Sequence, residues 1–139
     1  MRSGLPFGVD SNSNTTDSQG GRQRANRIGE GSLPRDQRTL SHFFDTAAFV
    51  NPPQYKFGNS PRNVIRSPGL VNFDLALSKT FPIREGIRLD FRTEAFNLMN
   101  TPAFSFPGAT IGTAAYGVIS STLPGTDARQ VQFALKLYF

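Results

Sequence analysis

The sequence contains no cysteine, and its only histidine is His42. The absence of cysteine excludes a disulfide framework, a thiolate metal site and a cysteine nucleophile. A single histidine without a spaced acidic partner supports neither a metal centre nor a Ser-His-Asp arrangement. The phosphate-binding pattern G-x-x-x-x-G-K-[ST] is also missing. We therefore expect no enzymatic activity, no catalytic residues, no bound metal and no cofactor.

Long apolar runs are missing as well. No stretch approaches the ~18 consecutive apolar residues that a membrane helix needs, so any contact with lipid must be made by strands. Only 37% of the residues are hydrophobic, and 13 glycines and 10 prolines make the chain rich in loops. The first eight residues lack the basic start and apolar run of a secretory signal.

Residues 1–41 are dominated by small polar residues and arginine, and they show neither a strand period nor a helix period. We predict that this segment is a polar loop or disordered. The net charge of +5 raises nucleic acid as a partner. Because the arginines are scattered, without a basic stripe, we favour a solvated loop and expect no nucleic-acid partner.

Aromatic residues enter the sequence between Ser41 and Gly69. They are interleaved with prolines, which cannot donate to a strand ladder. This pattern predicts an ordered loop rather than a set of strands. Its aromatic side chains either bind a ligand or pin the loop onto its scaffold, and we favour the second reading.

The clearest pattern lies at the carboxyl end. Residues 129–139 alternate between apolar and polar side chains and finish on Phe139. Such alternation is typical of a strand that separates two media. The length suits a tilted strand, which crosses a bilayer in about 9 to 11 residues and carries an aromatic residue at the interface.

Two earlier segments, 70–81 and 87–97, alternate in the same way and are separated by a short turn at 82–86. Alternation alone does not distinguish lipid from a protein core. The connections do, because bacterial barrels place short turns in the periplasm and long loops outside. The turn at 82–86 is short, whereas the connection over 98–128 is long and rich in glycine, proline, serine and threonine. We therefore expect ligand contacts, if any, from the loops 41–69 and 98–128.

These observations predict an all-β fold, a partial antiparallel transmembrane β-barrel with strands at about 70–81, 87–97 and 129–139 and long irregular loops. Three strands cannot close a barrel, since the smallest barrels have about eight and an open edge leaves backbone groups unpaired in lipid. We expect residues 42–139 to be the carboxyl-terminal portion of a larger barrel, a fragment without a plug. Its other strands and its secretion signal would lie upstream.

The alternation assigns side chains to two faces of this wall. The lumenal face is predicted to carry Asn72, Asp74, Arg88, Asp90, Arg92, Glu94, Gln132 and Lys136. We interpret the charges as an ion-pair ladder, because nothing places Asp90 and Glu94 in a cleft suited to acid–base catalysis. The assembly signal and membrane interface are predicted to consist of Phe81, Phe133, Leu135, Leu137 and Phe139.

Several segments together resemble the carboxyl-terminal region of Oar-like TonB-dependent outer-membrane receptors, the Acidobacteria-type family with a carboxypeptidase-regulatory-like domain. The resemblance covers about residues 41–139. The segments that carry it are Phe44–Phe49, Phe57–Gly69, Asn72–Lys79, Arg92–Phe104 and Arg129–Lys136.

The resemblance implies a transporter in the outer membrane of a Gram-negative bacterium, whose barrel is filled by an upstream plug and coupled through an upstream TonB box. It implies outer-membrane lipid, the barrel-assembly machinery and the upstream barrel and plug as partners, with TonB reached only through the upstream regions. The final octet, residues 132–139, is similar to the signal that the assembly machinery reads, with Ala134 where that signal prefers glycine.

Two other functions remain open from the residues. The chain is alternatively a small soluble basic β-sheet module that binds nucleic acid or an anionic glycan, or a non-transporting, adhesin-like outer-membrane barrel. Solubility without detergent would favour the first alternative, and the upstream sequence would decide the second.

Overall fold

The computed structural model describes residues 1–17 and 21–139, so residues 18–20 of the predicted polar segment 1–41 lie outside the described residues. The chain forms two compact units. Unit 1 consists of Met1, Leu70–Ala103 and Pro124–Phe139, and unit 2 consists of Arg2–Gly69 and Phe104–Leu123.

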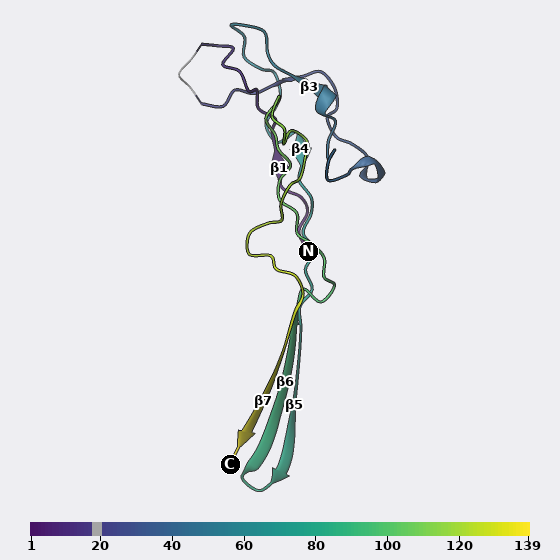
Figure 1. The fold of residues 1–139 in the computed structure, drawn as a ribbon, viewed down its shortest axis with the longest axis vertical. Coiled ribbons are helices and arrows are strands. Elements are labelled where there is room, and N and C mark those ends of the chain that lie inside the picture. Colours follow the sequence, from purple (N-terminus) through teal and green to yellow (C-terminus); the bar gives the residue numbers. More distant parts are fainter. Residues whose placement is uncertain (18–20) are drawn as a thin grey trace. The chain divides into compact units, whose positions relative to one another are not determined.

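Unit 1 is built on an antiparallel sheet of three strands in the order β5-β6-β7 (Figure 1). These strands are β5 (Leu75–Arg84), β6 (Ile87–Phe96) and β7 (Gln130–Tyr138). The strands predicted at 87–97 and 129–139 are thus confirmed to within one residue at each end. All-β architecture with antiparallel pairing is confirmed too.

The first strand lies later in the sequence than predicted. β5 begins at Leu75 rather than at residue 70, and it continues through Pro82 to Arg84. The turn is therefore only Glu85 and Gly86, and Gly86 has a φ of +77°, which glycine adopts without steric cost. A bulge between Pro82 and Arg84 shifts the register next to this turn, which is how a strand accommodates a proline.

The register separates the side chains of the sheet into an apolar face and a polar face. Pairing across β5, β6 and β7 aligns four rows of residues on the apolar face: Leu75–Ala95–Val131, Leu77–Thr93–Phe133, Lys79–Phe91–Leu135 and Phe81–Leu89–Leu137. The rows on the polar face are Ala76–Glu94–Gln132, Ser78–Arg92–Ala134, Thr80–Asp90–Lys136 and Pro82–Arg88–Tyr138.

The apolar face is uncovered. Leu77, Phe133 and Leu135 are 58, 71 and 67% exposed, and all ten residues of β5 are exposed. Contiguous apolar surface of this kind is costly in water and marks contact with protein or membrane. The sheet therefore does not obtain its stability from a core of its own.

Unit 2 contains two short strand pairs, each antiparallel. β1 (Pro6–Phe7) pairs with β4 (Ile65–Arg66), and β2 (Asn26–Arg27) pairs with β3 (Phe49–Val50). Two 3₁₀ helices, η1 (Arg35–Gln37) and η2 (Thr46–Ala48), complete its regular structure. No helix among the described residues is long and apolar enough to cross a membrane.

The core of unit 2 is centred on Phe44, which is fully buried. Its ring makes edge contacts with the rings of Phe7, Phe49 and Tyr116 at centroid distances of 6.0, 6.1 and 5.5 Å. The core is completed by Val9, Ala25, Phe43, Ala48, Phe49, Ile65 and Ile119. Three aromatic residues of the predicted loop 41–69 thus pin that loop onto its scaffold, whereas Tyr55 and Phe57 stay exposed.

The two stretches of unit 2 are joined by backbone hydrogen bonds. Asp10 donates to the carbonyl of Ala109 at 2.9 Å and accepts from Ile111 at 3.0 Å. Farther along, Phe43 donates to Gly117 at 2.9 Å. A further bond runs from Ile119 to Leu40 at 2.7 Å. Segments separated by the whole β5–β6 hairpin therefore share one fold.

Candidate functional site: the polar face and the pocket at the loop end of the sheet

The polar face gathers most of the residues predicted to face a lumen. Arg88, Asp90, Arg92 and Glu94 lie along β6, and Gln132 and Lys136 lie opposite them on β7. The central strand thus carries two cations and two anions in alternation.

One ion pair of the predicted ladder forms. Arg92 donates from Nε to Oε1 of Glu94 at 2.9 Å, and its Nη2 contacts the same oxygen. Gln132 donates from Nε2 to the other oxygen of Glu94, so both carboxylate oxygens are occupied. Charge-assisted bonds of this kind are stronger than neutral ones. The Arg92–Glu94 pair lies within β6, and the bond from Gln132 ties β6 to β7.

The other charges do not continue the ladder. The guanidinium of Arg88 lies 4.3 Å from the ring centroid of Tyr138, and the ammonium of Lys136 lies 4.5 Å from the same centroid. Both distances suit cation–π contacts. Asp90 Oδ1 is buried and has no hydrogen-bond partner among the described residues.

Asn72 and Asp74, also predicted for the lumenal face, precede the first residue of β5 and lie outside the strand. Asp74 Oδ1 accepts from the backbone amide of Asn97 at 2.8 Å, and the side-chain amide of Asn72 donates to Asp74 at 3.2 Å. Asp74 therefore fixes the end of the hairpin and does not pair with an arginine of β6, because its carboxylate is used locally.

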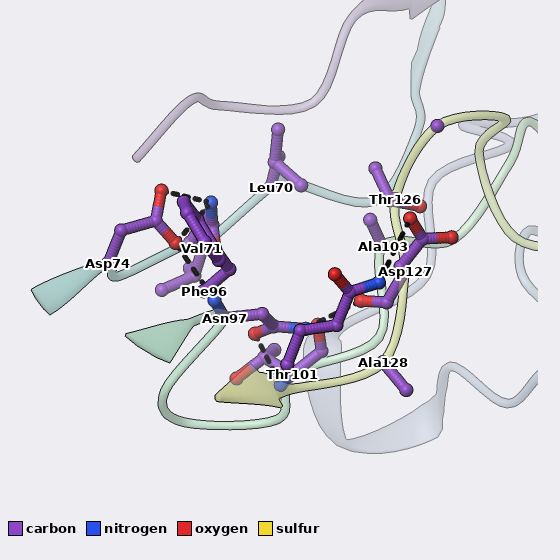
Figure 2. A pocket seen from close by; sticks show the side chains of 13 residues that line it. Leu70, Val71, Asp74, Phe96, Asn97, Thr101, Ala103, Thr126, Asp127 and Ala128 are labelled. Atoms are coloured by element: carbon purple, nitrogen blue, oxygen red, sulfur yellow. Dashed lines mark hydrogen bonds between the residues drawn. The ribbon is translucent and has the colours of Figure 1, made fainter. Parts of the chain in front are cut away.

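A pocket of about 390 Å³ opens at this end of the sheet, which we call the loop end (Figure 2). It is lined by residues that precede β5, by residues at and after the end of β6, and by residues at and before the start of β7. Its lining includes Leu70, Val71, Asn72, Asp74, Phe96, Asn97, Thr101, Asp127 and Gln130. Apolar side chains thus lie beside several amide and carboxylate groups.

Asn97 is the centre of the polar network in this pocket (Figure 2). Its side-chain amide donates to the carbonyls of Asp127 at 3.1 Å and Thr101 at 3.3 Å, and its Oδ1 accepts from the Thr101 amide at 3.0 Å. Both Asn97 and Asn100 adopt a φ of +50°, which asparagine tolerates better than most residues. Sequence reasoning missed Asn97, although two asparagines three residues apart directly after a strand are a turn signal.

The predicted assembly and interface residues lie on the apolar face or next to it. Phe133 stacks on Phe91 with ring centroids 6.3 Å apart, and Leu135 and Leu137 follow in the next rows. Phe81 lies within β5, three residues before its end, and shares a row with Leu137. Phe139 follows the last residue of β7 and is exposed.

Over residues 1–17 and 21–139, no group of three histidine, cysteine, aspartate or glutamate side chains is placed to hold a metal ion. The arrangement instead offers a wall with one apolar face and one polar face that carries an ion pair, and a polar pocket where the strands meet the loops.

Comparison with protein-family models decides between a wall in lipid and a sheet in water. The family described as outer membrane beta barrel domain matches residues 1–132. The chain belongs to this family. No curated protein matches the chain, and no solved structure matches it.

The chain, which we call the barrel domain, is located in the bacterial outer membrane. Membership of this family explains why the sheet has one apolar and one polar face, because side chains along the strands of outer-membrane barrels point alternately to lipid and to the lumen. The alternative of a soluble basic module is therefore wrong. The family is generally non-enzymatic.

Proposed function

We propose that the barrel domain is the carboxyl-terminal wall of a TonB-dependent outer-membrane transporter, and that its loops take part in the uptake of a ligand. The observation that carries the proposal is the position of the segments that resemble Oar-like receptors in the three-stranded sheet. Asn72–Lys79, Arg92–Phe104 and Arg129–Lys136 contribute to the loop end and to the three strands of one sheet. The polar face of this sheet carries one ion pair, and its apolar face is bare.

Connectivity supports the orientation of this wall. Residues 2–69 and 104–123 fold into one unit. In this proposal both stretches lie on the same side of the membrane. The segment between them contributes β5 and β6, which cross once in each direction. The two-residue turn at Glu85 and Gly86 then lies on the other side. Since bacterial barrels have short periplasmic turns and long outer loops, unit 2 is extracellular in this proposal.

The partners in the proposal follow from the uncovered surfaces of the sheet. β5 and β7 are edge strands with free backbone groups, and lipid cannot satisfy such groups. Further barrel strands would pair with both edges, a plug would face the polar side, and outer-membrane lipid would cover the apolar side. The barrel-assembly machinery would recognise β7 by edge pairing, with Phe139 beyond its end.

Single cysteines test the wall, because the chain has none of its own. Gln132→Cys and Phe133→Cys are a matched pair, since the two residues are neighbours on β7 but belong to opposite faces. In the protein's own outer membrane, a water-soluble maleimide should label the first variant and a lipid-soluble maleimide the second. Equal labelling of both by either reagent would contradict the assignment of faces.

TonB dependence needs its own measurement. A plugged, TonB-coupled barrel predicts that a membrane-impermeant maleimide labels Gln132→Cys faster in energised cells with TonB than in cells without it. The same rate in both strains would contradict TonB coupling and favour the non-transporting barrel. Asn14→Cys in unit 2 serves as the control, because its labelling should not depend on TonB.

A further inference from the structure

Unit 2 contains a second pocket, of about 590 Å³, that the wall function does not use. Three arginines, Arg22, Arg24 and Arg62, line it together with one carboxylate, Asp10, and the rings of Phe7 and Phe106. The volume lies in the range of small-molecule sites, about 300 to 1,000 Å³.

The positive charge of this pocket is only partly balanced. Arg22 donates to Oδ2 of Asp10 at 3.3 Å. Arg24 donates to the carbonyl of Ser60 at 3.2 Å, a neutral acceptor that leaves its charge uncompensated. Across the described residues, Arg62 makes neither a hydrogen bond nor an ion pair. Two guanidinium groups thus remain for an anion, and guanidinium is well matched to carboxylate and phosphate.

The apolar part of the lining has a defined geometry. The rings of Phe7 and Phe106 meet edge to face at a centroid distance of 5.9 Å, with an angle of 87° between their planes. Phe106 is exposed, so part of its ring is free for another contact. A ring-shaped or otherwise apolar body can pack there, because aromatic pairs favour offset and edge contacts.

The walls of the pocket are held together before any ligand arrives. Val9 accepts from the amide of Ala25 at 3.1 Å, and Ala25 accepts from the amide of Ser60 at 3.0 Å. Asp10 donates to Ala109 at 2.9 Å. These bonds join the four segments that carry the lining residues. A preformed site loses less conformational entropy on binding than a flexible loop.

We propose that this pocket binds a small organic anion, a molecule with a carboxylate or phosphate group next to a ring or other apolar body. Arg24 and Arg62 bind the anionic group, and Phe7 and Phe106 pack against the apolar part of the ligand. The ion pair with Asp10 holds Arg22 at the edge of the pocket. Delivery of the ligand into a barrel lumen rests on the proposed function above, whereas binding itself does not.

Protection of the arginines from phenylglyoxal tests the site in isolated outer membranes that contain the protein. Phenyl phosphate is the probe and phenol its neutral counterpart, and mass spectrometry follows each arginine separately. Phenyl phosphate should slow the modification of Arg24 and Arg62 saturably, by about tenfold at ten times its Kd. Arg35 in η1, outside the pocket, should react at the same rate with and without the probe.

A substitution distinguishes specific binding of phenyl phosphate in this pocket from non-specific attraction of anions to arginines. Arg62→Gln should weaken the protection of Arg24, and because Arg62 has no bond within the described residues, the fold of unit 2 should be unaffected. Arg35→Gln should leave the protection unchanged. Equal protection by phenol, equal protection of Arg35, or protection by heparin alone would overturn the proposal. Because no step requires transport, a failure of TonB coupling would leave this result intact.

Discussion

The backbone amide of Asn97 donates to a carboxylate oxygen of Asp74 at 2.8 Å, which joins the residue before β5 to the residue after β6. The two strands are thereby closed at the loop end by a side chain, as Glu85 and Gly86 close them at the other end by the chain itself.

Asp74→Ala should loosen this closure. The substitution removes the acceptor of the Asn97 amide and of the Asn72 side chain, at a cost of about 1 to 3 kcal/mol. The free energy of unfolding of the barrel in lipid vesicles, from urea titration, measures the effect. Asp36→Ala, on the exposed 3₁₀ helix η1, is the matched control and should change little. An equal loss in both variants would contradict the role of Asp74.

A charge on the apolar face should be far more harmful than the loss of one on the polar face. Leu135→Arg should cost about 2 to 4 kcal/mol if Leu135 lies near the bilayer midplane. Lys136→Gln should be mild, because Lys136 belongs to the polar face and its ammonium lies 4.5 Å from the ring centroid of Tyr138. The amount of folded barrel in the outer membrane measures both. Equal tolerance would refute the assignment of faces.

Lys79 is the one charged residue in the four rows of the apolar face, where it lies in the row of Phe91 and Leu135. A lysine exposed to lipid costs about 2 to 4 kcal/mol at the midplane and about 0 to 1 near the interface. Lys79→Leu should therefore raise the free energy of unfolding in vesicles, whereas Ser78→Leu on the polar face should not. A loss of stability in Lys79→Leu would indicate that the ammonium has a favourable partner in the membrane.

Gly58 approaches the backbone of unit 2 so closely that a side chain does not fit. An added Cβ would lie 1.9 Å from the carbonyl oxygen of Arg24 and 2.5 Å from that of Ala25. Gly58→Ala should destabilise unit 2 by about 1 to 3 kcal/mol, the usual cost of overpacking. Limited proteolysis of the outer-membrane protein reports the change. Gly21→Ala, where an added Cβ meets nothing within 4 Å, should resist proteolysis as the parent protein does.

Tyr116 should resist deprotonation at high pH. Burial, followed by the nearby charge of Asp45, raises the pKa of Tyr116 to about 12. A raised pKa means that the neutral phenol favours the folded state, so this contribution is complete below about pH 10 and is lost as the pH approaches 12. Absorbance titration at alkaline pH should show a late phase that Tyr116→Phe removes. Tyr55→Phe, at an exposed position, should leave this phase in place.

The three long strands could be predicted from sequence because period-two alternation is a local signal. The start of the first strand could not. Val71 and Phe73 alternate with Asn72 and Asp74 as strand residues do, but the strand begins only after Asp74, whose carboxylate binds a backbone amide of a residue far along the chain. A hydrogen bond from a side chain to a distant backbone amide does not change the alternation of apolar and polar residues, so the sequence pattern does not reveal it.

The fold of unit 2 could not be predicted from the sequence for a related reason. Its segments are irregular, and its core depends on contacts such as those of Phe44 with Phe7 and Tyr116, which are distant in sequence. Composition suggested that the aromatic residues anchor a loop, but it did not indicate the partner. The arginines looked scattered because only the folded chain brings Arg24 and Arg62 to one pocket.

The division of unit 2 into Arg2–Gly69 and Phe104–Leu123 limits how this domain can be rearranged by evolution or engineering. Neither stretch carries the whole of its core, so unit 2 cannot be transplanted as a single loop. A graft must move both stretches together with the hairpin between them. The two stretches of unit 2 and the β5–β6 hairpin are therefore inherited as one piece.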